Sequence, residues 1–101
     1  MAAPQVRVPE TEVAEFCRRN GVRKFSFFGS ILTERFSDTS DIDVLVEFKP
    51  GWPVGYLRMA AMERELSTLF GRKVDLRTPE ELSRYFRDEV MKAAQVQYVG
   101  K

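Results

Sequence analysis

The sequence contains no histidine and only one cysteine, Cys17, among its 101 residues. The absence of histidine excludes serine–histidine and cysteine–histidine hydrolases, imidazole acid–base chemistry and histidine-ligated metals. A single cysteine excludes an internal disulfide and a multi-cysteine zinc site. Cys17 lies at helical spacing from Val13, which predicts that it fills the core. An enzyme with this composition must rely on carboxylates, on metal ions held by carboxylates, or on lysine.

Net charge and long apolar runs are also lacking. Sixteen basic and fifteen acidic residues leave a formal charge of +1, so strong binding to nucleic acid or to an anionic membrane is not expected. No stretch approaches the length of a membrane span, which predicts a cytoplasmic protein. The apolar fraction of 44% and the charged fraction of 31% are typical of a folded globule. The length predicts one domain over residues 1–101.

Helical and strand patterns alternate along the chain, with short turns between them. Helices are predicted over residues 9–20, 54–70 and 79–94, a turn or two of helix over 31–36, and strands over 22–28, 41–48 and 73–77, with an edge strand over 96–99. Leu57 is in helical register with the apolar positions of the second long helix. Thr78 and Glu81 form a capping box that predicts the start of the last helix.

Two predicted strands carry aspartates at positions that alternate with apolar residues. Asp41 and Asp43 alternate with Ile42 and Val44, and Asp75 lies between apolar residues on the next strand. If these strands are neighbours in a sheet with helices on one side, the three carboxylates project from the uncovered side. They would repel one another unless a cation joins them. Mg²⁺ or Mn²⁺ is the natural occupant. An aspartate at the start of a strand often only caps the chain or accepts a hydrogen bond in a loop. That role would explain Asp41, but it would not explain Asp43 or Asp75.

Gly29 and Ser30 stand at the end of the first predicted strand. A glycine before a helical turn lets backbone N–H groups approach and hold a phosphate. A cation held by the three carboxylates would need a further role, and a phosphate bound at Gly29 and Ser30 suggests one.

The stretch "GSILTERFSDTSDID" contains Gly-Ser, about ten residues, and then Asp-x-Asp. It resembles the signature of the nucleotidyltransferase fold that is shared with the DNA polymerase β superfamily. Within that fold the chain resembles the minimal nucleotidyltransferase (MNT) proteins, which are often encoded beside a HEPN-domain protein. The resemblance extends to "LFGRKVDLRTPE" and "FRDEVMKAA" and covers nearly the whole chain. It implies an α+β fold in which a small mixed β-sheet has helices on one face and an open acidic face.

The resemblance also implies a reaction and its residues. Asp41 and Asp43 would bind two Mg²⁺ ions that bridge the triphosphate of ATP. Asp75 would complete the site of the metal ion that lowers the pKa of the acceptor hydroxyl. Ser30 and the backbone after Gly29 would hold the β- and γ-phosphates. The implied activity is that of an antitoxin that transfers AMP from ATP to a hydroxyl of its partner, a HEPN toxin, in a hetero-oligomer.

One segment departs from the family pattern. Many members follow Gly-Ser with an arginine-bearing segment of the "RARG" type, whereas residues 31–34 here are Ile-Leu-Thr-Glu. Arg35, the first arginine after them, could reach the triphosphate, or it could be solvated or paired with Glu34 or Asp38. Lys73 and Arg77 could steer phosphate or only neutralise nearby carboxylates.

Two functional hypotheses follow from these features. Intact aspartates favour an adenylyltransferase. The altered segment favours a catalytically weak antitoxin that neutralises a HEPN ribonuclease by direct binding.

Overall fold

The computed structural model describes residues 6–100. Residues 1–5 and 101 of the predicted domain lie outside the described part. Along the chain the elements are α1 (Glu10–Arg19), β1 (Val22–Phe28), the 3₁₀ turn η1 (Gly29–Leu32), β2 (Ile42–Phe48), α2 (Tyr56–Phe70), β3 (Val74–Arg77), the 3₁₀ turn η2 (Pro79–Glu81), α3 (Arg87–Ala93) and β4 (Gln95–Val99).

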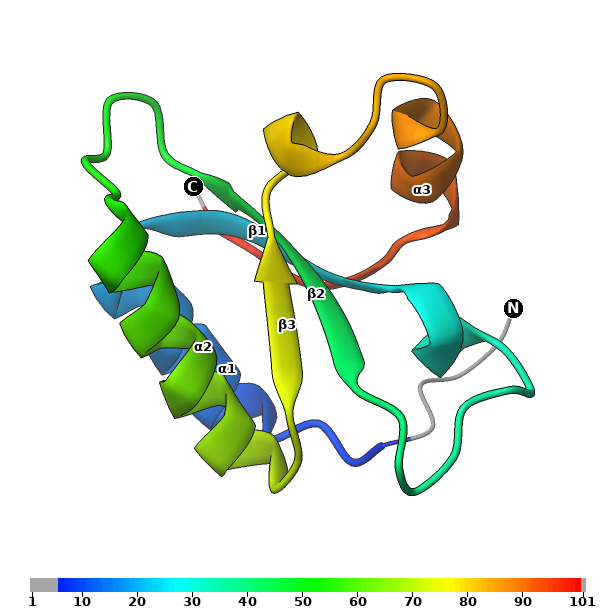
Figure 1. Cartoon of the computed structure of the whole chain (residues 1–101). Helices are drawn as coiled ribbons and strands as arrows, with labels where there is room; N and C mark the ends of the chain where they lie inside the picture. The colour runs from blue at the N-terminus through cyan, green and yellow to red at the C-terminus, as the bar shows by residue number, and fades with distance from the viewer. Residues whose placement is uncertain (1–5, 101) are drawn as a thin grey trace.

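The four strands form one mixed sheet in the order β3-β2-β1-β4 (Figure 1). β1 pairs antiparallel with both β2 and β4, whereas β2 and β3 run parallel. The parallel pair is possible because α2 forms the crossover between its two strands. The α+β class, the mixed sheet and the edge strand near the C-terminus are confirmed.

α1 and α2 pack together against one face of the sheet (Figure 1). Alternate strand residues point into this layer, and Phe25 and Phe27 are completely buried there with their rings edge to face. Cys17 is also completely buried, and burial raises the pKa of its thiol to about 12. The predicted core role of Cys17 is confirmed. The core is completed from α1, β2, α2 and β3 by residues that include Val13, Phe16, Ile42, Val44, Val46, Met62, Leu66, Val74 and Leu76.

Side chains of α2 cover the outer edge of β3. The backbone N–H of Leu76 donates to Glu63 Oε2 at 2.7 Å, and that of Val74 donates to Ser67 Oγ at 3.0 Å. These amides would otherwise point away from the sheet without a strand partner. α2 ends at Gly71, whose left-handed φ of 69° turns the chain directly into β3.

The helix predicted over residues 79–94 is wrong in its middle. The capping box of Thr78 and Glu81 is present, but it begins only the short turn η2. Leu82 then takes an extended conformation, and α3 begins at Arg87. The Arg87 guanidinium donates to the Leu82 carbonyl at 2.9 Å, so a side chain replaces the backbone partner that a continuous helix would supply. A local capping signal therefore does not set helix length.

Leu57 is a second departure from the sequence pattern. It is 82% exposed at the start of α2, next to Tyr56, which is 87% exposed. Its place in the helical pattern of apolar residues therefore does not bury it.

The second face of the sheet is mixed in character. Ser26 and Leu45 are paired across β1 and β2 and alternate with the core residues, yet both are buried. The segment containing η2 and α3 lies on this side of the sheet (Figure 1). The acidic part of the face, next to η1, remains accessible. Across residues 6–100, no helix is both long and apolar enough to cross a membrane.

Candidate functional site

Three residues form a row across the second face, where β1 ends and where β2 and β3 begin. Phe28 on β1 is opposite Asp43 on β2, and Asp43 is opposite Asp75 on β3. Residues paired in this way project from the same face of a sheet. Asp43 and Asp75 are therefore paired on neighbouring strands, as the sequence predicts.

Gly29 lies against the carboxylate of Asp43. Its φ is +77°, and a Cβ built on it would stand 2.3 Å from Asp43 Oδ2. The backbone of Ser30 donates a hydrogen bond to the same carboxylate. Glycine is therefore required here by its left-handed conformation and by direct contact with an acidic side chain. The predicted phosphate loop at Gly29 and Ser30 therefore contacts Asp43, one of the predicted metal ligands.

The loop is held in shape from its far end. Thr33 donates from both its backbone N–H and its hydroxyl to the Ser30 carbonyl, each at 2.9 Å. Arg35 lies beyond this bend, where its own backbone N–H donates to Thr33 Oγ1 at 3.2 Å. The side chain of Arg35 is exposed and forms no ion pair with Glu34 or Asp38.

Asp41 lies at the entrance to β2 and is half-buried. Its carboxylate is 3.9 Å from the Lys73 ammonium, which stands at the entrance to β3. Of the two roles considered for Lys73, this ion pair favours neutralisation of a neighbouring carboxylate. Within residues 6–100, no group of three or more acidic or cysteine side chains is arranged so that it could hold a metal ion.

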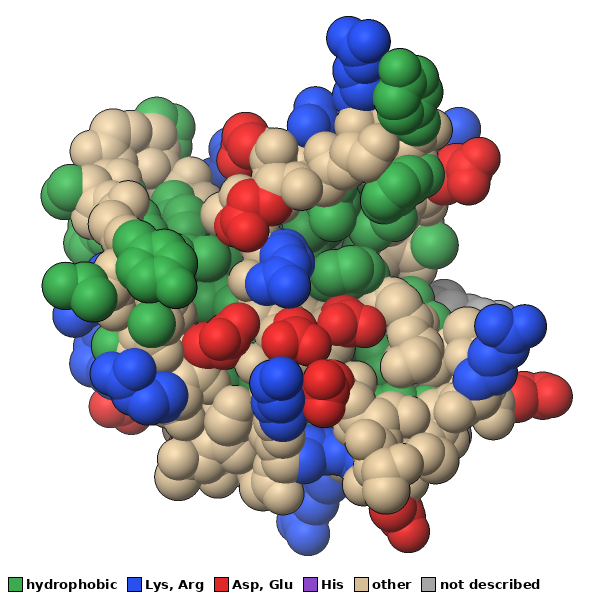
Figure 2. Space-filling view, viewed as in Figure 1, with side chains coloured by type: hydrophobic (Ala, Val, Ile, Leu, Met, Phe, Trp, Pro, Cys, Tyr) green, Lys and Arg blue, Asp and Glu red, His purple; other side chains and the backbone are tan. Residues whose placement is uncertain are grey.

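The electrostatics of Asp43 show that the carboxylates nevertheless act on one another. Partial burial raises its pKa, and the charges of Asp75 and Asp41 raise it further. The charge of Arg77 and the hydrogen bond from Ser30 oppose this rise. Figure 2 shows acidic side chains gathered on this face with basic side chains directly beside them.

The chemistry of these donors suits a hard divalent cation, although Asp41, Asp43 and Asp75 are not arranged here as a coordination site. Carboxylate oxygens are the ligands that Mg²⁺ and Mn²⁺ prefer, and the repulsion acting on Asp43 is the kind that such an ion relieves. In this structure two of the three side chains have other partners: Asp41 faces Lys73, and Asp43 accepts from Ser30. Binding an ion would exchange those contacts for coordination.

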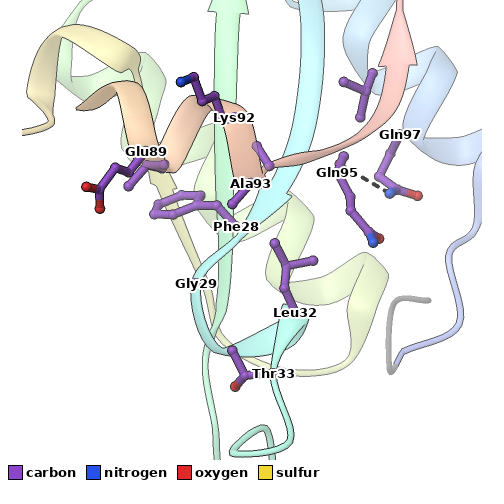
Figure 3. A pocket seen from close by; sticks show the side chains of 12 residues that line it. Phe28, Gly29, Leu32, Thr33, Glu89, Lys92, Ala93, Gln95 and Gln97 are labelled. Carbon is purple, nitrogen blue, oxygen red and sulfur yellow. Dashed lines mark hydrogen bonds between the residues drawn. The ribbon is translucent and has the colours of Figure 1, made fainter. Parts of the chain in front are cut away.

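A hollow of about 1160 Å³ adjoins the loop on its other side (Figure 3). It lies between η1, α3 and the start of β4, and Phe28 and Gly29 form the wall nearest to the carboxylates. The walls are mainly apolar, and the two charged lining residues are Glu89 and Lys92. Such a hollow suits a flat or apolar group attached to a phosphate. The hollow was not predicted from the sequence. The one indication was the apolar Phe28 directly before Gly29 and Ser30.

The chain matches the model of a protein family described as "Nucleotidyltransferase domain", over residues 11–96. It is also similar to a protein of Methanocaldococcus jannaschii named "Putative protein adenylyltransferase MJ0435". The two are 33% identical over 76 residues, which cover 75% of this chain and 80% of the relative.

Solved structures share the fold. One described as "Structure of putative minimal nucleotidyltransferase" has a TM-score of 0.70 at 29% identity, covering 84% of this chain and 85% of the other. A toxin–antitoxin crystallised with AMP-PNP has a TM-score of 0.73 at 18% identity, covering 93% of this chain and 76% of the other. A complex of tri-AMPylated Shewanella oneidensis HEPN toxin with MNT antitoxin has a TM-score of 0.64 at 18% identity, covering 90% and 70%.

Proposed function

The chain belongs to the nucleotidyltransferase domain family, and we therefore propose that it transfers AMP from ATP to a hydroxyl group of a HEPN-domain toxin. The observation that carries the proposal is the row of Asp43 and Asp75 on adjacent strands, with the Gly29 loop pressed against Asp43. A relative named as an adenylyltransferase and a fold neighbour bound to an AMPylated HEPN toxin support the choice of reaction and partner.

The carboxylates of Asp41, Asp43 and Asp75 would hold two divalent ions, Mg²⁺ or Mn²⁺, which when bound neutralise the triphosphate and lower the pKa of the acceptor hydroxyl. Ser30 and the backbone after Gly29 would bind the β- and γ-phosphates of ATP. The two hydrogen bonds from Thr33 to the Ser30 carbonyl would help to hold this loop in shape. The loop and the carboxylates touch at Asp43, so the nucleotide is positioned by both.

In the proposed step, the acceptor oxygen forms a bond to the α-phosphorus of ATP. The bond from that phosphorus to the oxygen bridging to the β-phosphate breaks, and pyrophosphate leaves with the electron pair. The proton of the hydroxyl passes to the carboxylate of Asp75 and then to water. No covalent enzyme intermediate is needed, which agrees with a chain that contains no histidine.

The accessibility of the site supports a separate protein as the acceptor. Asp43 and Asp75 are both half-buried, and the acidic part of the sheet face is accessible beside η1. A tyrosine, serine or threonine on a flexible segment could present its hydroxyl there. The added AMP would place a bulky negative group on the toxin near its RNA-binding surface.

Direct binding without chemistry is the second candidate. It is favoured by two observations: residues 31–34 lack a basic side chain, and no group of carboxylates within residues 6–100 is arranged to hold a metal ion. On this alternative the chain would neutralise the toxin by stoichiometric contact, and the aspartates would be idle.

Intact-mass spectrometry of a HEPN toxin separates the two candidates. The toxin is incubated with ATP, Mg²⁺ and a hundredth of its molar amount of this protein. Transfer predicts a mass increase by whole AMP units, which Asp43→Asn abolishes and Asp38→Asn, on the exposed loop before β2, leaves intact. An unmodified toxin that is inhibited only at equimolar protein would reject the enzyme and establish direct binding.

A further inference from the structure

Arg77 occupies a defined place on the acidic face. It follows Asp75 by two residues on β3 and is opposite Leu45, as Asp75 is opposite Asp43. Residues two apart on a strand project from the same face and are separated by roughly 7 Å. The Arg77 side chain therefore leaves the sheet beside the carboxylate row, and its length can span the distance back to it.

The loop and Arg77 stand on opposite sides of that row. β1 runs antiparallel to β2 with Phe28 opposite Asp43, so Gly29 and Ser30 lie beyond the row towards the start of β2. Arg77 lies beyond it towards the end of β3. A nucleotide that crosses the row would have one phosphate end at the loop and the other beside Arg77.

The Arg77 guanidinium has capacity for a ligand. Its Nη1 donates to the carbonyl of Leu76 in its own strand at 3.1 Å. Among residues 6–100 the ion pairs involve Arg19, Arg23, Lys24 and Lys73, and none involves Arg77. A guanidinium carries five N–H donors in a fork that matches the oxygens of a phosphate.

The site also lacks positive charge for binding a triphosphate, and Arg77 can supply it. Residues 29–34 contain no basic side chain, so the loop offers neutral donors to a highly charged triphosphate. Lys73 is already paired with Asp41. Arg77 acts on the row itself, because burial, Asp75 and Asp41 raise the pKa of Asp43 whereas the charge of Arg77 lowers it.

We propose that Arg77 is a catalytic residue that binds a non-bridging oxygen of the α-phosphate of the nucleotide. The inference rests on the proposed nucleotidyl transfer and assigns the two ends of the substrate: Ser30 and the loop take the β- and γ-phosphates, and Arg77 takes the phosphate that is transferred. Arg77 keeps its proton throughout. Its N–H donors stabilise the negative charge on the α-phosphate oxygens as the acceptor oxygen bonds to phosphorus and pyrophosphate departs.

Titration calorimetry with the two halves of the substrate tests this assignment. Each protein is titrated with AMP and, separately, with pyrophosphate, both in the presence of Mg²⁺. Arg77→Met is expected to weaken AMP binding roughly tenfold or more, the usual effect of losing a charge-assisted hydrogen bond, and to leave pyrophosphate binding unchanged. Ser30→Ala is expected to show the converse, and Arg77→Lys to recover part of the AMP affinity, since lysine restores the charge without the fork.

Arg64→Met is the matched control, because Arg64 is an exposed arginine on α2. It should bind both ligands as the wild type does. Thermal unfolding followed by circular dichroism checks that each variant is folded. The assignment is overturned if Arg77→Met binds AMP as tightly as the wild type, if it loses AMP and pyrophosphate equally, or if the wild type binds neither ligand.

Transfer to the HEPN toxin is measured in parallel and distinguishes the two proposals. If the wild type transfers AMP, Arg77→Met should lower kcat at least roughly tenfold at saturating ATP. A wild type that binds AMP through Arg77 but never modifies the toxin would reject the proposed enzyme and keep Arg77 as a nucleotide ligand. An active wild type with an equally active Arg77→Met would reject the role of Arg77 alone.

Discussion

The two faces of the sheet are built from the same strands and differ residue by residue. On the face under α1 and α2, Phe27 and Val44 are completely buried. On the other face their neighbours Phe28 and Asp43 are half-buried, and the charges of Asp75 and Asp41 raise the pKa of Asp43. One face lowers the free energy of the fold by apolar burial, and the other raises it by desolvated like charges.

This difference implies that stability and chemistry can be changed separately. A substitution on the helix-covered face should act on unfolding, whereas one on the acidic face should act on ligand binding with little loss of stability. Four variants, each paired with a comparison variant, test where this separation holds, in order of decreasing effect.

Truncation of a buried ring should have the largest effect. Phe27→Ala removes a completely buried aromatic side chain and is expected to lower the free energy of unfolding by about 3–5 kcal/mol. Phe28→Ala, one residue later and on the other face, should cost less than half as much. Urea denaturation of both variants gives the comparison. Equal costs would show that the second face contributes as much to stability as the first.

Gly29→Ala should have the next largest effect, because Gly29 lies against the carboxylate of Asp43 at the end of β1. The added Cβ would clash with Asp43 Oδ2, and the φ of +77° disfavours alanine, so a loss of about 1–3 kcal/mol is expected. Gly51→Ala is the control, since Gly51 has a φ of +76° but open space around it. The difference between the two denaturation free energies isolates the contact with Asp43. No difference would mean that the carboxylate moves aside freely.

Asp43→Asn should reverse the sign of the usual mutational effect in the metal-free protein. The pKa of Asp43 is raised in the folded state by burial and by its acidic neighbours. The folded protein therefore binds this proton more tightly than the unfolded chain, and stability falls as pH rises from the ordinary aspartate pKa through the raised one. Above that window Asp43→Asn should be more stable than the wild type, and below it the gain should vanish.

Melting temperatures measured across pH in the presence of a chelator test this expectation. Asp38→Asn, on the exposed loop, should give no comparable gain at neutral pH. An Asp43→Asn variant that is less stable than the wild type at neutral pH would show that the hydrogen bond from Ser30 outweighs the repulsion.

Leu57→Ser should have the smallest effect, within about 0.5 kcal/mol, because Leu57 is 82% exposed. Leu66→Ala on the same helix removes a completely buried side chain and should cost about 2–5 kcal/mol. Chemical denaturation of this pair checks whether α2 is stabilised by its middle turns alone. A large loss for Leu57→Ser would indicate that the first turn packs in solution.

The strands and their faces could be predicted from the sequence because alternation is a local property of each strand. Asp43 and Asp75 were expected on neighbouring strands, and the pairing of the two residues follows that expectation. The close contact between Gly29 and Asp43 was not predictable, because it depends on how β1 ends relative to β2. The sequence pattern predicts only the approach of a phosphate at this glycine, whereas the structure also places it against a carboxylate.

The later part of the chain was less predictable for a related reason. The capping box at Thr78 is local and was predicted, but the end of the turn at Leu82 depends on the side chain of Arg87 five residues later. The exposure of Leu57 likewise depends on its tertiary surroundings and not on its local sequence pattern. The spacing of apolar residues along a helix does not show whether another element packs against each of them.

The side chains of α2 that accept hydrogen bonds from Val74 and Leu76 have a consequence for self-association. A bare strand at the margin of a sheet can template the addition of strands from other molecules, which is a route to fibrils and to domain-swapped oligomers. Glu63 and Ser67 occupy the two amides that an incoming strand would need on β3. Any growth of the sheet by strand addition should therefore proceed from β4, at the opposite margin.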